Sequence, residues 1–165
     1  TFTSLRNRSF LELTYSTGAR RQEVLDLKMK DIDFRNGILK IKGKGQKERV
    51  VPFGAMALSW LRKYCKQRAN GTSEFLWLNQ KDYKLSSSYV DALFRTIRKE
   101  TGVDCSCHTL RRSCASHLLK NGMSLFMIAD LLGHEDLSKL KYYLCVPMAD
   151  LKETQKLIEP RTDHV

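Results

Sequence analysis

The sequence predicts an α+β fold, a mostly helical domain that carries one small antiparallel sheet of three strands. Apolar residues recur at helical spacing before residue 31 and after residue 52. Between these points the pattern changes to short apolar runs, which are separated by turn-forming residues at 35–37 and 43–46. The Asn-Gly pair in the first turn is the strongest short signal for a hairpin. The length of 165 residues suits one domain with a single core.

The first helix is predicted over residues 4–16, where Leu5, Phe10 and Leu13 supply the apolar positions. The Thr-Gly pair at 17–18 breaks this pattern and is expected to end the helix. Further helices are expected at 20–28, 55–68, 86–99, 107–120, 124–132, 136–144 and 149–158, and strands at 32–34, 38–41, 49–52 and 75–77, the last being a short edge strand.

The charge of the chain points to a polyanionic partner. Lys and Arg exceed Asp and Glu by enough to give a net charge of +11 at pH 7. Such an excess attracts nucleic acid, with a merely basic surface or anionic lipid as the alternatives. No apolar run is long enough to span a membrane, and neither an amphipathic membrane helix nor a lipidation motif supports the lipid alternative. We therefore expect a nucleic-acid partner and no membrane.

The cysteines predict neither disulfides nor a zinc site. They form no C-x-x-C pair and cannot be assembled into four zinc ligands at suitable spacing, so reduced and partly buried thiols are expected. The sequence shows no secretory leader, and we expect a cytoplasmic, nucleoid-associated protein. The five cysteines are Cys65, Cys105, Cys107, Cys114 and Cys145.

Two basic residues are placed where they can meet an anion. Arg20 stands where a turn enters a helix, so that its side chain and nearby backbone N–H groups can face one anionic ligand. Lys44 lies between two glycines on the predicted hairpin turn and can project into a groove. Its surroundings lack the spacing of a phosphate-binding P-loop. Taken alone, each residue can also be an ordinary solvated surface cation.

A third group of candidates lies further along the chain. His108 and Arg111 are three residues apart on a predicted helix, so they share a face and can converge on one phosphate. Gly133 is a natural C-cap for the helix before it, and His134 follows directly. Tyr143 lies on the next predicted helix. Individually, a histidine at a helix boundary and a tyrosine within a helix are usually structural.

In this order, the segments resemble the tyrosine recombinases, the family of phage integrases, Xer and Cre. The family pattern T-G-x-R-x-x-E matches residues 17–23, and the hairpin pattern G-K-G-x-K-x-R-x-x-P matches 43–52. The H-x-L-R box matches 108–111, and the L-G-H box matches 132–134. The resemblance covers roughly residues 3–150, and several boxes in the family's order are far more specific than any one of them.

The resemblance implies a complete catalytic set: Arg20, Lys44, His108, Arg111, His134 and Tyr143. It places the nucleophilic tyrosine nine residues after the last histidine, which selects Tyr143 over its neighbour Tyr142. Glu23 is expected to orient one of the cations. The chain departs from the family pattern at Cys107, Arg112 and Leu144, where Pro, His and a small polar residue are common, but none of these changes removes a catalytic group.

These groups suit phosphoryl transfer from DNA. Two arginines can grip the nonbridging oxygens while negative charge develops, Lys44 can protonate the leaving 5′-oxygen, and the histidines can bind the phosphate. The sequence has no cluster of acidic residues suited to two Mg²⁺ ions, so the arginines are expected to replace metal, and no cofactor is expected. The resemblance implies a covalent 3′-phosphotyrosyl intermediate and rejoining without ATP.

The predicted protein is a site-specific DNA recombinase, with residues 1–165 as its catalytic domain and an N-terminal core-binding domain outside the chain. Its expected partners are double-stranded DNA and further copies of itself, four protomers on two sites, and the segment 149–158 can dock on a neighbouring protomer or on its own domain. One alternative is a nicking-closing enzyme similar to type IB topoisomerases, which the recombinase spacing of the boxes opposes. Another is a DNA-binding module without catalysis, which the complete catalytic set opposes.

Overall fold

The computed structural model describes residues 1–43, 48–68 and 73–133. Over these ranges the fold is α+β, as the sequence predicts. The helices predicted at 136–144 and 149–158 and the hairpin turn at Lys44 lie outside the described residues. The described elements are α1 (Phe2–Thr17), α2 (Arg21–Leu25), a 3-10 turn η1 (Met29–Asp31), β1 (Ile32–Asp33), β2 (Ile38–Lys42), β3 (Glu48–Pro52), α3 (Ala55–Gln67), α4 (Ser87–Thr101), α5 (Cys107–Lys120) and α6 (Leu125–Leu132).

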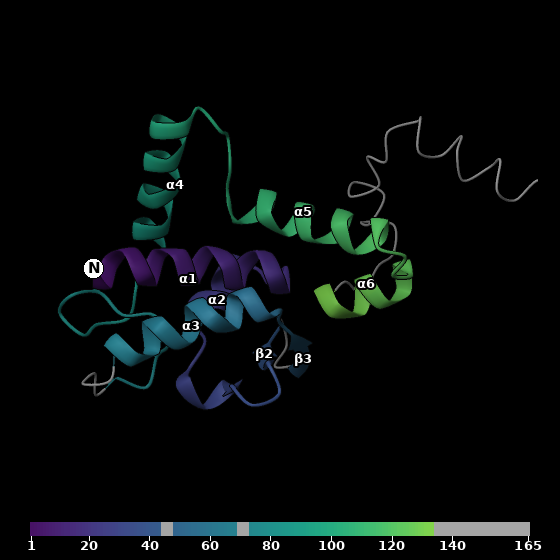
Figure 1. Cartoon of the computed structure of the whole chain (residues 1–165), viewed down its shortest axis with the longest axis horizontal. Coiled ribbons are helices and arrows are strands. Elements are labelled where there is room, and N and C mark those ends of the chain that lie inside the picture. The colour runs from purple at the N-terminus through teal and green to yellow at the C-terminus, as the bar shows by residue number, and fades with distance from the viewer. Residues whose placement is uncertain (44–47, 69–72, 134–165) are drawn as a thin grey trace, which may run out of the picture.

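Helix α1 is the central element, with α3 on one side and α4 and α5 on the other (Figure 1). Its Phe10 and Leu13 are buried in the main core. Trp77 packs edge-on against Phe10 and stacks on Tyr64, with ring centroids 5.4 Å apart in both pairs. The indole Nε1 of Trp77 also donates to the backbone oxygen of Val24 at 2.9 Å. This bond ties α2, whose first turn carries candidate site residues, to the core.

The sheet has the strand order β1-β2-β3, and both pairs are antiparallel. Along β2, Leu39 and Ile41 are buried while Lys40 and Lys42 are exposed, which is the alternation expected of a sheet with one face on the core. The pairing of Ile41 with Arg49 places Arg49 on β3 close to the hairpin end of the sheet. The sheet therefore positions one basic side chain that the sequence left without a role.

Two predicted elements are wrong in detail, and both errors have one cause. The helix predicted over 20–28 ends at Leu25, and residues 75–77 form no strand, only an isolated bridge between Lys28 and Phe75. The backbone of Leu27 accepts from the amide of Leu76 at 2.8 Å, and the amide of Met29 donates to the oxygen of Glu74 at 2.9 Å. These long-range bonds extend the chain where local propensity favours helix, and they are too few to make a ladder.

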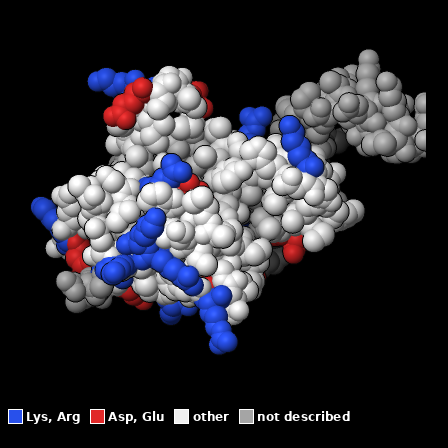
Figure 2. Space-filling view, in the orientation of Figure 1, with Lys and Arg blue, Asp and Glu red and all other residues white. Residues whose placement is uncertain are grey.

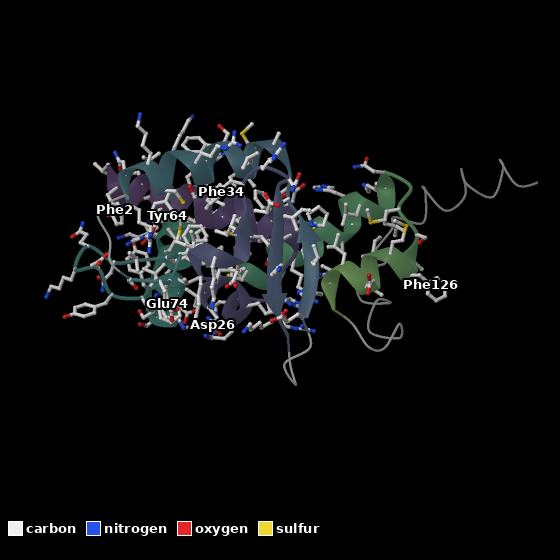
Figure 3. The ribbon with its side chains drawn as sticks, turned by 90° about the horizontal axis from the view of Figure 1, so that it is seen from below. Phe2, Asp26, Phe34, Tyr64, Glu74 and Phe126 are labelled. Atoms are coloured by element: carbon white, nitrogen blue, oxygen red, sulfur yellow. The ribbon has the colours of Figure 1, made fainter. Side chains whose placement is uncertain are left out.

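A second, smaller core joins α5 to α6. Ala115, Ile128, Ala129 and Leu132 are buried together, and α6 ends at Gly133, which adopts the left-handed conformation (φ 68°) predicted for a C-cap. On the opposite side of α6, Phe126 is 73% exposed and projects away from the body (Figure 3). The small core fixes the position of the α6 C-terminus.

Positive charge is spread widely over the surface. Figure 2 shows more lysine and arginine than acidic side chains on the visible face, and they lie over several elements. In the part of the chain that the structure describes, no helix is both long enough and apolar enough to cross a membrane.

Gly18 provides a test of how tightly α1 packs on α5 and α6. Its φ of +58° disfavours any side chain, and a Cβ there would overlap the Leu132 side chain and lie 3.3 Å from the Cys114 Sγ. Gly102 has a similar φ of +72° but no atom within 4 Å of the same position. We expect Gly102→Ala to cost about 1–2 kcal/mol of unfolding free energy from backbone strain. Gly18→Ala should cost roughly 1–3 kcal/mol more, from overpacking.

Urea denaturation of both variants measures the difference, because the strain is common to the two and the overlap is not. Equal losses of stability would show that the Leu132 side chain relaxes without cost.

Candidate active site

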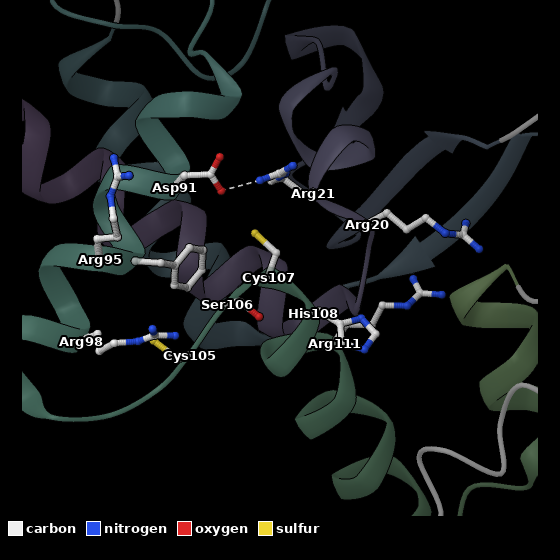
Figure 4. A pocket seen from close by; sticks show the side chains of 11 residues that line it. Arg20, Arg21, Asp91, Arg95, Arg98, Cys105, Ser106, Cys107, His108 and Arg111 are labelled. Atoms are coloured by element: carbon white, nitrogen blue, oxygen red, sulfur yellow. Dashed lines mark hydrogen bonds and ion pairs between the residues drawn. The ribbon is translucent and has the colours of Figure 1, made fainter.

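A basic pocket of about 550 Å³ lies between the start of α2, helix α4 and the start of α5. Its lining includes one carboxylate, on Asp91, which pairs with Arg21 at 2.5 Å. Figure 4 shows Arg20, His108 and Arg111 at one end of the pocket and the basic side chains of α4 on its opposite wall. The basic residues of the lining are Arg20, Arg21, Arg95, Arg98, Arg111 and His108. The excess of cations suits an anionic ligand.

Local backbone structure places Arg20 at the edge of this pocket. Gly18 ends α1 in the left-handed conformation, and Arg20 then takes an extended conformation as the N-cap of α2. The amide of Arg20 donates to Glu23 Oε2 at 2.7 Å, which closes half of a capping box. Because this amide is bonded to Glu23, it is not one of the backbone N–H groups that could bind an anion at the start of α2.

Arg111 is the buried cation of the site, with 4% of its surface exposed. Its Nη1 donates to the Gly18 oxygen at 2.6 Å and its Nη2 to the Leu132 oxygen at 2.8 Å. His108 lies one turn earlier on α5, is exposed, and lines the same pocket. The structure therefore brings together Arg20, His108 and Arg111, which the sequence analysis had selected from two distant segments.

Glu23 is the acidic centre next to these cations. Its side chain is 8% exposed and accepts from the Arg20 guanidinium at 3.0 Å and, through both carboxylate oxygens, from Arg49 at 3.0 and 2.8 Å. Burial raises the pKa of Glu23, but the hydrogen bonds from Arg49 and Arg20 outweigh burial and hold the pKa below its usual value. Glu23 therefore stays ionised between two arginines.

Three arginines donate hydrogen bonds to consecutive backbone oxygens at the C-terminus of α6. Arg49 Nε donates to Leu131 O at 3.0 Å, Arg111 Nη2 to Leu132 O at 2.8 Å, and Arg20 Nη2 to Gly133 O at 3.1 Å. The last carbonyls of a helix lack intrahelical partners and lie at the negative end of its dipole, so cations there are favourable. Sequence analysis missed Arg49, whose only signal was its place in the hairpin pattern.

The remaining predicted residues, Lys44, His134 and Tyr143, lie outside the described residues. No tyrosine of the described ranges lines the pocket. The thiol of Cys107 does line it, but burial raises its pKa to about 11, so it is not a thiolate nucleophile near neutral pH. Within the described ranges no group of His, Cys, Asp and Glu side chains could hold a metal ion.

The lowered pKa of Glu23 predicts a pH-dependent stability. A carboxylate whose folded pKa is depressed stabilises the fold above its unfolded pKa, and this contribution is lost as pH falls through the folded pKa. We expect Glu23→Gln to lower the unfolding free energy by about 1.5–3 kcal/mol at pH 7, the range for hydrogen bonds to charged groups. The gap between variant and wild type should narrow as the pH falls below about 4.5.

Chemical denaturation at a series of pH values measures this gap. Glu74→Gln is the matched control, because it removes an exposed carboxylate paired with Lys28 at 2.7 Å, where solvent screens the interaction. A gap for Glu23→Gln that does not change with pH would contradict the prediction.

Comparison with known proteins agrees with this geometry. Residues 1–149 match the phage integrase family. The chain is 36% identical to tyrosine recombinase XerD of Listeria monocytogenes serotype 4b over 165 residues, covering 95% of this chain and 56% of the relative. It is 34% identical to tyrosine recombinase XerC of Chlamydia caviae, covering 98% of this chain and 54% of that protein. The chain thus spans about half the length of these relatives.

Solved structures show the same fold. The crystal structure of XerA recombinase superimposes with a TM-score of 0.84 at 23% identity, covering 96% of this chain and 58% of that one. The XerH site-specific recombinase, bound to palindromic difH substrate in a post-cleavage complex, gives a TM-score of 0.80 at 28% identity, with 97% of this chain and 48% of XerH covered. The match over residues 1–149 and the similarity to XerD and XerC show that the chain belongs to the phage integrase family of tyrosine recombinases.

Proposed function

We propose that this chain cleaves and rejoins double-stranded DNA through a tyrosine nucleophile, as the catalytic part of a site-specific recombinase. The observation that carries the proposal is the convergence of Arg20, His108 and Arg111 on one basic pocket. The family membership supports it, as does the DNA substrate bound to the related XerH.

Arg20 and Arg111 are suited to stabilise the transition state. Attack on a DNA phosphodiester adds a second negative charge to a group that already carries one. Two guanidinium groups can bind the nonbridging oxygens through several N–H donors, and their charge does not depend on pH. Backbone oxygens hold both groups before substrate arrives, so little reorganisation is needed as the charge develops. His108 adds a further hydrogen-bonding group at the same end of the pocket.

The nucleophile and the acid are proposed from the sequence pattern. Tyr143 attacks phosphorus, the bond to the 5′-oxygen breaks, and Lys44 gives a proton to that oxygen as it leaves. A phenol has a pKa of about 10, so its proton must leave during the attack. His108 or His134 accepts this proton, and the surrounding cations stabilise the oxyanion. The covalent 3′-phosphotyrosyl bond keeps the energy of the broken ester. Attack by a 5′-hydroxyl then rejoins DNA without ATP, and His134 completes the phosphate-binding set.

The activity is proposed for an assembly larger than this chain. Since the chain spans about half of XerD and XerC, we infer that residues 1–165 form the catalytic domain and act with a separate DNA-clamping domain. The expected assembly is four protomers on two DNA sites, acting on DNA of the nucleoid or of a mobile element in the cytoplasm. The net charge of +11 favours the DNA partner.

The identity of the nucleophile can be tested with two adjacent variants. Neighbouring side chains on a helix point about 100° apart, so if the helix predicted at 136–144 forms, only one of Tyr142 and Tyr143 can face the phosphate. We expect Tyr143→Phe to abolish the covalent complex with a nicked suicide substrate, while Tyr142→Phe, the matched control, keeps most of it. Peptide mapping of the trapped adduct decides between the two tyrosines, and a nucleotide on Tyr142 would overturn the assignment.

Excess EDTA should leave the wild-type reaction unchanged.

The roles of Lys44 and Arg111 can be separated by the leaving group. Arg111→Ala should lower the cleavage rate about 10²–10³-fold with DNA binding largely kept, because the lost charge acts mainly in the transition state. A substrate with sulfur in place of the 5′-bridging oxygen needs no acid, so it should rescue Lys44→Ala and not Arg111→Ala. The reverse pattern in single-turnover assays would show that Lys44 is not the acid.

Two rival functions predict different outcomes when the same protein is assayed for covalent complex formation and for strand exchange. A DNA-binding module would form no covalent complex with the suicide substrate. An enzyme similar to type IB topoisomerases would form the complex and relax supercoils but would not exchange strands in an assay with two sites. Strand exchange between the two sites is the result expected of a recombinase.

A further inference from the structure

Arg49 has the contacts of a residue that orients other groups. Its side chain is 15% exposed, and it does not line the basic pocket. All three guanidinium nitrogens donate to protein atoms: Nε to Leu131 O at 3.0 Å, Nη1 to Glu23 Oε1 at 3.0 Å, and Nη2 to Glu23 Oε2 at 2.8 Å. Such a bidentate pair fixes the carboxylate in position and in rotation. Arg49 therefore determines how Glu23 is held.

Glu23 passes this restraint to Arg20. The oxygen Oε1 that accepts from Arg49 also accepts from Arg20 Nη1, and Oε2 accepts from the Arg20 amide. The Arg20 side chain is 46% exposed and, on a long stem, would sample many rotamers without these bonds. The chain of contacts from Arg49 through Glu23 thus restrains the guanidinium of Arg20, a residue that lines the pocket.

A second route leads through the end of α6. A Cβ on Gly133 would lie 3.0–3.2 Å from the guanidinium of Arg49, so this glycine lets the chain pack directly on that group. The oxygen of Gly133 in turn accepts from Arg20 Nη2 at 3.1 Å. Arg49 therefore supports both acceptors of the Arg20 guanidinium, the carboxylate of Glu23 and the oxygen of Gly133.

We propose that Arg49 is a positioning residue for the reaction, which holds the Arg20 guanidinium in the orientation that binds the scissile phosphate. This role rests on the proposed function of the pocket. Arg49 does not touch DNA in this role; it acts through Glu23 and Gly133. Its variants should therefore affect the chemical step more than DNA binding.

Arg49→Met removes the charge and all three donors while keeping a long apolar side chain. We expect it to lower the single-turnover rate of covalent complex formation about 10–100-fold, the size of effect found when a residue that orients a metal ligand is lost. DNA affinity should remain near that of wild type. Arg49→Lys should recover part of the rate, because it keeps the positive charge and one donor nitrogen. The matched control is Arg62→Met, which removes an exposed arginine bonded to the Phe34 oxygen, and should cleave at the wild-type rate.

A neutral substrate tests whether the effect passes through Arg20. Replacing one nonbridging oxygen of the scissile phosphate by methyl removes the charge that Arg20 is proposed to bind. The rate deficits of Arg20→Ala and Arg49→Met should then shrink together, and adding Arg49→Met to Arg20→Ala should cost little further rate with the natural substrate. Full additivity, or a deficit of Arg49→Met that is equal on both substrates, would show a merely structural role and overturn the proposal.

Stability is controlled separately, since Arg49→Met leaves the buried Glu23 side chain without its main partner. Circular dichroism at the assay temperature checks folding, and the double variant Glu23→Gln, Arg49→Met removes the unpaired carboxyl group if the single variant unfolds. This double variant should keep the slow cleavage. If wild type forms no covalent complex, the proposed function fails; if wild type and Arg49→Met cleave equally fast, only the positioning role fails.

Discussion

The C-terminus of α6 accepts hydrogen bonds from arginines in three separate parts of the chain. The geometry of the candidate site depends on these bonds. The acceptors are the consecutive carbonyl oxygens of Leu131, Leu132 and Gly133. They are bonded, in this order, by Arg49 from β3, Arg111 from α5 and Arg20 from the turn before α2. A helix end leaves such oxygens without internal partners. Satisfying them with guanidinium groups caps the helix and fixes the three arginines relative to one another.

Carbonyl oxygens are suitable acceptors for cations that must keep their charge. An ion pair neutralises an arginine, as Asp91 does for Arg21 at the pocket wall. A carbonyl dipole holds the guanidinium without cancelling its net charge, so Arg111 can be almost fully buried and still present a positive field to an anion. Glu23 is the exception in this cluster, and it lies between two arginines. The cluster therefore keeps an excess of positive charge.

The rest of the fold supports this arrangement by fixing where α6 and α2 lie. The small core of Ala115, Ile128, Ala129 and Leu132 sets α6 against α5. Gly18 admits the Leu132 side chain at the end of α1, where a larger residue would overlap it. Trp77 in the main core bonds to the backbone of α2. The packing of α6 on α5 and of α2 on the main core thus determines the positions of the arginines.

The sequence by itself determined the elements and the candidate residues that depend on neighbours in the chain. The helix at 107–120, the three-stranded sheet and the Gly133 cap follow from local periodicity and turn chemistry, and motif order selected Arg20 and Arg111. Tertiary structure alone decided that α2 ends at Leu25. The residues that follow, Leu27 and Met29, form backbone hydrogen bonds with Leu76 and Glu74, some fifty residues away. It also decided the role of Arg49, whose acceptors on Glu23 and Leu131 are 26 and 82 residues distant. Contacts of such separation leave no periodic trace in one sequence, since they arise only when packing brings the elements together.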